Sequence, residues 1–200
     1  MVWEIVDNAV DEALNGYGNE ITLTIHKDGS LSVLDGGRGI PVDLHKATGM
    51  PAVQLIFTTL HSGGKFSNKA YQSSAGLHGV GSSVTNALSE YCDVTVFRDG
   101  KINHIRFKDG GKLETPLEVL GNTKKRGSLI RFKPDAKIFS SVDFKYDIIA
   151  NHIQESAYLL KGVKFTLHDE RSGQHAEFCY KDGIKEYVNY LTEKKQHINR

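Results

Sequence analysis

The chain has 200 residues, of which 39% are hydrophobic and 24% charged, and a formal net charge of +1, the balance of a globular domain with an apolar core. No apolar run approaches membrane-spanning length and no basic-then-apolar leader begins the chain, so we expect no membrane contact and a cytoplasmic location. The excess of Lys and Arg that nucleic-acid binding usually requires is missing, so we expect no direct binding of DNA by this chain.

Apolar residues recur at helical spacing from Val2 to Ala13, which predicts a helix. No capping side chain precedes this helix, so we expect native sequence before Met1 and interpret the chain as a fragment. Two strands are expected over 21–26 and 30–35, joined by a short hairpin turn. The glycine-rich run 36–41 that follows is predicted to be a loop.

Helices are expected over 51–61 and 82–90, the second with Val84, Ala87 and Leu88 at core spacing. The polar, glycine-rich segment 62–75 between them is long enough to form a mobile lid. The second half predicts strands over 94–98, 102–107, 128–133, 163–168 and 175–180, with helices over 147–161 and 184–191. This order favours an α+β fold, a two-layer sandwich with helices on one face of a mixed sheet.

The only dense basic run is Lys124-Lys125-Arg126, in a glycine-flanked loop between two expected strands. A solvated loop is its simplest interpretation.

Glu4, Asn8 and Glu12 are spaced four residues apart and therefore lie on one face of the first helix. A solvated helix face explains this spacing without any function. A site is the alternative, because an amide oxygen can ligate Mg²⁺ and a carboxylate can orient or deprotonate water.

Asp35 shares strand parity with the apolar Leu31 and Val33, which predicts a carboxylate at the edge of a core layer. Such a group needs hydrogen-bond donors. A backbone N–H of the loop that follows is one candidate donor, and a purine amino group is the other. Gly37 and Gly39 would let a flat ring approach the backbone.

A third candidate element leads directly into the helix expected from Ser82; it consists of Gly76, Leu77, His78, Gly79, Val80 and Gly81. Its backbone N–H groups and the helix N-terminus would suit a phosphate, although a glycine turn alone also fits the spacing. The spacing is neither that of a Rossmann fingerprint nor that of a P-loop. Lys65 could also reach a phosphate, but an exposed loop lysine is the simpler interpretation.

In chain order, these three elements resemble the N, G1 and G2 boxes of the GHKL ATPase superfamily, which covers gyrase B subunits, Hsp90, MutL and bacterial histidine kinases. The stretches 2–13, 37–41, 60–66 and 76–88 resemble the ATPase subunits of bacterial type IIA DNA topoisomerases. Segments 143–146 and 155–160 are more similar to the B subunit of topoisomerase IV (ParE) than to gyrase B. The resemblance implies the GHKL (Bergerat) fold over residues 1–200.

The resemblance also implies roles for individual residues. Glu4 would be the general base, Asn8 would hold Mg²⁺ against ATP, and Asp35 would accept the adenine amino proton. Tyr71 would close over the nucleotide. The remaining ATP contacts implied are Gly37, Gly39, Ile40, Lys65, Gly76, Leu77, His78, Gly79, Val80, Gly81, Ser82 and Ser128. Arg38, Pro41 and Arg98 would form a rim that binds ATP-competitive inhibitors.

The activity implied is ATP-driven DNA strand passage, decatenation and relaxation in the bacterial cytoplasm. The partners implied are a second copy of the ATPase protein (ParE- or GyrB-like), a DNA-cleaving protein like ParC or GyrA, and DNA. An N-terminal arm and a transducer domain would be missing, so we expect a monomer that binds ATP with little turnover. Gyrase B, another GHKL ATPase and a non-hydrolysing nucleotide sensor remain alternatives. Gly36 and Gln72 depart from the family pattern.

Overall fold

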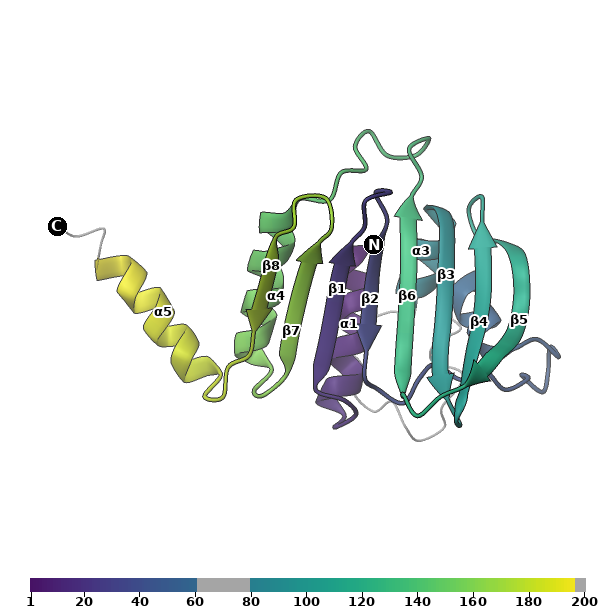
Figure 1. Cartoon of the computed structure of the whole chain (residues 1–200), viewed down its shortest axis with the longest axis horizontal. Coiled ribbons are helices and arrows are strands. Elements are labelled where there is room, and N and C mark those ends of the chain that lie inside the picture. Colours follow the sequence, from purple (N-terminus) through teal and green to yellow (C-terminus); the bar gives the residue numbers. More distant parts are fainter. Residues whose placement is uncertain (61–79, 197–200) are drawn as a thin grey trace.

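The computed structural model describes residues 1–60 and 80–196. Eight strands form one sheet in the order β5-β4-β3-β6-β2-β1-β7-β8 (Figure 1). The strands are β1 Glu20–Ile25, β2 Leu31–Asp35, β3 Ser89–Arg98, β4 Lys101–Lys108, β5 Lys112–Asn122, β6 Gly127–Pro134, β7 Lys164–Asp169 and β8 His175–Phe178. Among these strands only the β1–β7 pair is parallel, so the sheet is mixed and mainly antiparallel, as expected.

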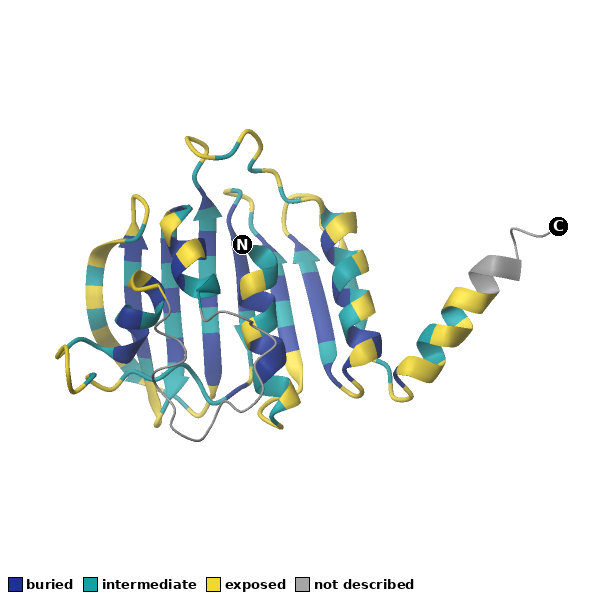
Figure 2. Ribbon diagram, turned by 180° about the vertical axis from the view of Figure 1, so that it is seen from behind, coloured by how far each residue is buried: buried dark blue, intermediate teal, exposed yellow. Residues whose placement is uncertain are grey.

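Helices cover one face of this sheet, which confirms the predicted two-layer α+β sandwich. The described helices are α1 Val2–Leu14, α2 Ala52–Thr58, α3 Gly81–Ala87, α4 Tyr146–Leu159 and α5 Ile184–Gln196. Figure 2 shows α1 to α4 lying over the sheet, whereas α5 extends away from it. Where α5 begins, Tyr187 lies 5.0 Å from the ring of Tyr158 in α4. None of the described helices is long and apolar enough to cross a membrane.

The core lies between the sheet and α1 to α4, because every second side chain of the central strands is apolar and points to this face. In β1 these residues are Ile21, Leu23 and Ile25, and their cross-strand partners in β2 include Leu31 and Val33. Helix α1 buries Ile5, Val6 and Ala9 of the apolar stripe that its spacing predicted, together with Val10, whereas Val2 and Ala13 at the ends of the stripe are half-buried. The same register that buries Leu31 and Val33 brings Asp35 to the end of the core layer, as the sequence predicted.

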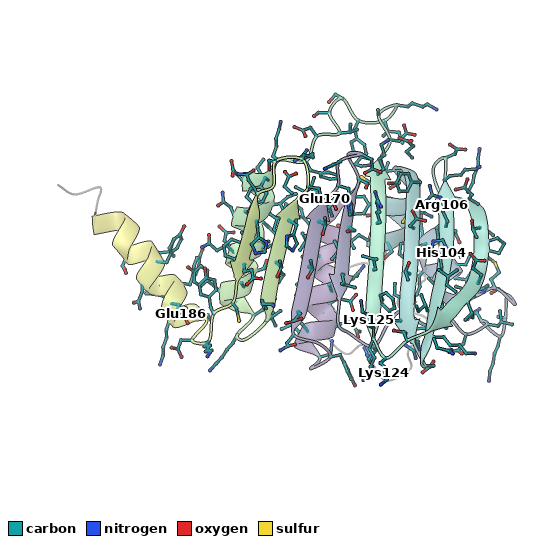
Figure 3. The ribbon with its side chains drawn as sticks, viewed as in Figure 1. His104, Arg106, Lys124, Lys125, Glu170 and Glu186 are labelled. Atoms are coloured by element: carbon teal, nitrogen blue, oxygen red, sulfur yellow. The ribbon has the colours of Figure 1, made fainter. Side chains whose placement is uncertain are left out.

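The open face of the sheet is polar and its charges pair across strands. On β4, Arg106 and His104 (labelled in Figure 3) both contact the carboxylate of Asp93 on β3. On the neighbouring strand β6, Arg131 donates to Asp28, which accepts a further hydrogen bond from Tyr91. The alternation of apolar and charged residues therefore reflects a sheet with one covered and one uncovered face.

Strand β5 is missing from the sequence expectations. It is an edge strand with mostly exposed side chains and irregular register against β4, so no apolar alternation marks it.

The predicted packing of the helix after Val80 is wrong. Val84 and Ala87 are exposed and Leu88 is half-buried, whereas Thr85 and Asn86 are buried. Asn86 is tolerated there because its Nδ2 donates to the carbonyl of Phe57 at 2.9 Å, at the end of α2. The helix also ends at Ala87, and the following residues already belong to β3.

We predict that Phe132→Ala lowers the free energy of unfolding by about 3–5 kcal/mol, because it opens a cavity under the central strand β6. Phe132 is fully buried. Urea denaturation measures the change. The control is Leu120→Ala on β5, where the side chain is 59% exposed and the expected change is within about 0.5 kcal/mol. Equal effects of the two substitutions would contradict this location of the core.

Candidate functional site

One end of α1 lies against the start of α3. The amide of Asn8 donates from Nδ2 to Ser82 Oγ at 3.1 Å. Gly81 packs directly on Glu4, since a Cβ added to Gly81 would lie 2.9 Å from Glu4 Cβ and would collide with the Glu4 carboxylate. Only glycine lets the N-terminus of α3 approach the carboxylate this closely. The predicted base, the predicted metal ligand and the end of the predicted phosphate loop are thus brought together.

The other end of α1 holds the loop that follows β2. Glu12 accepts hydrogen bonds from three groups of Arg38: the backbone N at 2.9 Å, Nε at 3.1 Å and Nη2 at 2.7 Å. The guanidinium also lies 4.1 Å from the ring centroid of Tyr17, just beyond α1. The side chains of this ion pair are only 14% and 21% exposed, so it is shielded from screening by solvent.

The sequence placed Glu12 on a helix face but did not identify this role. Glu12 and Arg38 are 26 residues apart, and no local spacing relates a helix carboxylate to a loop arginine at that separation. The two residues meet only in the folded chain, because α1 packs over β1 and β2 and its last turn lies beside the end of β2.

Asp35 lies at this second end. The pKa of its carboxyl is raised to about 6, chiefly by burial and to a smaller extent by the negative charge of Glu12, although hydrogen bonds from the backbone N–H groups of Gly37 and Ser128 act in the opposite direction. The Gly37 N–H donates to Asp35 Oδ1 at 2.8 Å. The backbone donor that the sequence left open as one alternative is therefore present. A carboxylate this desolvated favours any further donor that enters the site.

Strand β6 completes the surroundings of Asp35, because β6 is the neighbour of β2 in the sheet. Gly127 has a φ of 117°, and a Cβ there would lie 2.8 Å from the carbonyl carbon of Asp35, so no other residue fits without displacing that strand end. The next residue, Ser128, is buried, and its Oγ accepts the N–H of Ile40 at 3.1 Å.

The predicted rim residues separate into two groups. Arg98 donates from Nη1 to the Gly39 carbonyl at 2.7 Å, and both Arg98 and Arg38 line a cavity of about 430 Å³. Pro41 is half-buried in the same loop but does not line this cavity.

Six of the predicted site residues lie outside the described part of the chain: Lys65, Tyr71, Gly76, Leu77, His78 and Gly79. Of the predicted phosphate loop, Val80 is described, as the residue that precedes α3. Its carbonyl accepts the hydroxyl of Ser83 at 2.9 Å, a bond that closes the first turn of the helix.

The two ends of the site are joined by α1 itself. Eight residues separate Glu4 from Glu12, which corresponds to about 12 Å along a helix axis. At the Glu4 end lie a carboxylate, a carboxamide and a helix N-terminus, and at the Glu12 end lie the half-buried carboxylate of Asp35 and a glycine-rich loop. The Glu4 end could therefore bind an anion and the Glu12 end could accept hydrogen bonds, and α1 fixes the distance between them.

Three comparisons with known proteins place the chain in one family. Residues 1–138 match the model of the family described as histidine kinase-, DNA gyrase B- and HSP90-like ATPases. The chain is 53% identical over 199 residues to the B subunit of DNA topoisomerase 4 from Staphylococcus aureus, for example strains MW2 and N315. This match covers 98% of the chain, which spans about 30% of the length of these curated relatives.

The fold is also similar to a crystal structure of the 43K ATPase domain of Thermus thermophilus gyrase B in complex with an aminocoumarin. The TM-score is 0.85 at 43% sequence identity, and the match covers 95% of this chain and 48% of that one. Because the family model matches most of its length and the fold is the same, the chain belongs to the histidine kinase-, DNA gyrase B- and HSP90-like ATPases.

Proposed function

We propose that this chain is the ATP-binding and ATP-hydrolysing domain of a bacterial type IIA DNA topoisomerase, with the B subunit of topoisomerase IV (ParE) favoured over gyrase B. The observation that carries the proposal is the placement of Glu4 and Asn8 against the N-terminus of α3, with the half-buried Asp35 near the other end of α1. The 53% identity to the topoisomerase 4 protein, against 43% to the gyrase B domain, supports the preference between the two.

At the Asp35 end the site suits a purine. The ionised carboxylate of Asp35 would accept the adenine amino group, and Gly37 and Gly39 leave the backbone open to a flat ring. Ser128 and Ile40, joined by their hydrogen bond, would form one wall. Arg38, Pro41 and Arg98 would form the outer rim, where ATP-competitive inhibitors would bind.

At the Glu4 end the site suits a metal triphosphate. Asn8 uses its Nδ2 on Ser82, and its Oδ1 has no hydrogen-bond partner within the described residues, so the oxygen that Mg²⁺ prefers is available. Bound Mg²⁺ would neutralise charge on the phosphates. Glu4, beside Gly81, would accept a proton from the attacking water.

The glycine run from Gly76 to Gly81, followed by Ser82, would enclose the phosphates. Lys65 would reach them, and Tyr71 would close over the nucleotide.

For the longer protein we propose ATP-driven strand passage, with decatenation and relaxation of DNA in the bacterial cytoplasm. Its partners would be a second copy of the same ATPase protein, a DNA-cleaving protein like ParC or GyrA, and DNA. We propose that residues 1–200 form the ATP-binding domain and that an N-terminal arm and a transducer domain complete it. Gyrase B, with negative supercoiling as its activity, is the alternative that the gyrase B structural match supports.

We predict that Glu4→Gln in the longer protein lowers ATP hydrolysis by at least about a hundredfold, within the range for loss of a general base. ATP-analogue affinity should change by less than about threefold, because the carboxamide keeps the shape that packs against Gly81. Phosphate release and calorimetry measure the two quantities. Glu20→Gln on β1, with an exposed carboxyl, is the control. Hydrolysis that survived in Glu4→Gln would favour a nucleotide sensor, in which Glu4 is not the base.

We predict that Asp35→Asn weakens binding of an ATP analogue about tenfold to a hundredfold at pH 7.5, as expected for losing a hydrogen bond to a charged group. Calorimetry of the isolated chain measures this. Unchanged affinity would exclude Asp35 as the adenine contact.

The same substitution has a stability effect of defined sign. Folding raises the pKa of Asp35 from 3.8 to about 6, so its stabilising contribution is full below pH 3.8 and is lost as the pH rises through about 6. Asn carries no charge at any pH. The difference in melting temperature, Asp35→Asn minus wild type, should therefore be higher at pH 8 than at pH 4. A difference independent of pH would contradict the raised pKa.

We predict that the isolated 200-residue chain binds a non-hydrolysable ATP analogue as a monomer and hydrolyses ATP poorly. The reason is that the arm and the transducer, which we propose complete the catalytic assembly, are not part of it. Analytical ultracentrifugation with the analogue and phosphate release at micromolar protein test this. Rapid turnover by the isolated chain would overturn the proposed domain division.

A further inference from the structure

A positively charged cavity lies beside the Asp35 end of the proposed ATP site. Its volume is about 430 Å³, and five cationic side chains line it: Arg38, Arg98, Lys124, Lys125 and Arg126. They come from three separate segments, namely the loop after β2, the end of β3 and the loop between β5 and β6. Figure 3 shows Lys124 and Lys125 together at the end of the sheet where β6 begins.

The positive charge of this cavity is only partly neutralised. Arg38 is paired with Glu12, and Arg98 lies 3.5 Å from the carboxylate of Asp99. In the described part of the chain Lys124, Lys125 and Arg126 form no ion pair, and all three are exposed. Two carboxylates against five cations leave three positive charges, although the whole chain has a net charge of only +1.

The loop that carries these charges has a defined backbone. The Thr123 N–H donates to the Gly100 carbonyl at 2.8 Å, and the Lys125 N–H donates to Thr123 Oγ1 at 2.9 Å. At its other end Gly127 packs against the backbone of Asp35. In addition, the Lys125 ammonium lies 6.0 Å from the ring centroid of Phe97. The cations are therefore presented on a framework fixed at both ends.

The lining indicates which class of partner this cavity fits. Apart from the cations it contains only Asp99, Gly100 and Thr123, so the described residues offer no apolar side chain there to anchor a protein partner. Protein–protein interfaces have an apolar core, whereas protein–nucleic acid interfaces are more polar and much more positively charged. Lys and Arg side chains that contact phosphates supply affinity without reading sequence.

We propose that this cavity and the loop 123–126 bind the phosphodiester backbone of nucleic acid, without sequence preference. The inference rests on the charge and lining of the cavity and does not require that the chain hydrolyses ATP. It revises the expectation of no direct DNA binding, which followed from a net charge that averages this local excess with acidic regions elsewhere. Contact with the chain's own nucleotide is assigned to other residues, so the two sites are separable by substitution.

The test is fluorescence anisotropy of a labelled DNA duplex titrated with the 200-residue chain at about 50 mM salt, where phosphate contacts are least screened. The wild type should bind with a logarithmic salt slope of about −3, one unit for each of the three unpaired cations. The variant K124Q/K125Q/R126Q should bind at least tenfold more weakly and show a much smaller slope. The double variant K124Q/K125Q should lie between the two.

The matched control is K161Q/K181Q/K185Q, which removes three exposed lysines at the other end of the sheet. It should retain the wild-type affinity and slope. Equal weakening of both triple variants would show an effect of overall charge and overturn the proposal. So would undetectable binding by the wild type, or competition by polyglutamate as effective as that by unlabelled DNA.

Melting temperature and ATP-analogue affinity of K124Q/K125Q/R126Q should equal those of the wild type, because the substituted side chains are exposed and do not contact Asp35, Asn8 or Glu4. DNA binding lost with nucleotide binding intact supports the separate site. Nucleotide binding absent from the wild type would instead contradict the proposed function, so the two failures are distinguishable.

Discussion

The ion pair between Glu12 and Arg38 is the interaction on which the arrangement of the site depends. It joins the last turn of α1 to the loop after β2 through three hydrogen bonds, one of them from the backbone. Because that loop also carries Gly37, Gly39 and Ile40, its position sets the surroundings of Asp35 and the contacts with Ser128 and Arg98. Removing either partner of a shielded pair would leave a charge uncompensated within the site.

This arrangement places the carboxylates of Glu12 and Asp35 near each other, which lowers the stability of the folded chain when both are ionised. The charge of Glu12 and burial both raise the pKa of Asp35, so its ionised form is less favourable than that of a surface aspartate. A ligand that donates a hydrogen bond to Asp35 would relieve part of this cost. The opposite end of α1 uses close packing instead, with Gly81 allowing a helix N-terminus to approach Glu4.

The loop between β5 and β6 lies between the proposed ATP site and the positively charged cavity. The loop leads into Gly127, the first residue of β6, which packs against the backbone of Asp35, and Lys124, Lys125 and Arg126 form no ion pair within the described residues. A solvated basic loop was the simplest interpretation of Lys124-Lys125-Arg126 while its neighbours were unknown. In the folded chain Arg38 and Arg98 line the same cavity as these three residues. The loop is therefore part of a charged cavity and is not an isolated charged loop.

The sequence by itself determined the amphipathic α1 and most of the strands, because each depends on local periodicity, and it predicted three candidate site elements from helical spacing, strand parity and glycine spacing. It did not determine the burial of Asn86 and Thr85, the edge strand β5 or the pairing of Glu12 with Arg38. Those features depend on contacts between segments far apart in the chain, such as the hydrogen bond from Asn86 to the carbonyl of Phe57. Local sequence patterns do not predict such contacts. Tertiary structure alone decided that one helix would hold both ends of the site.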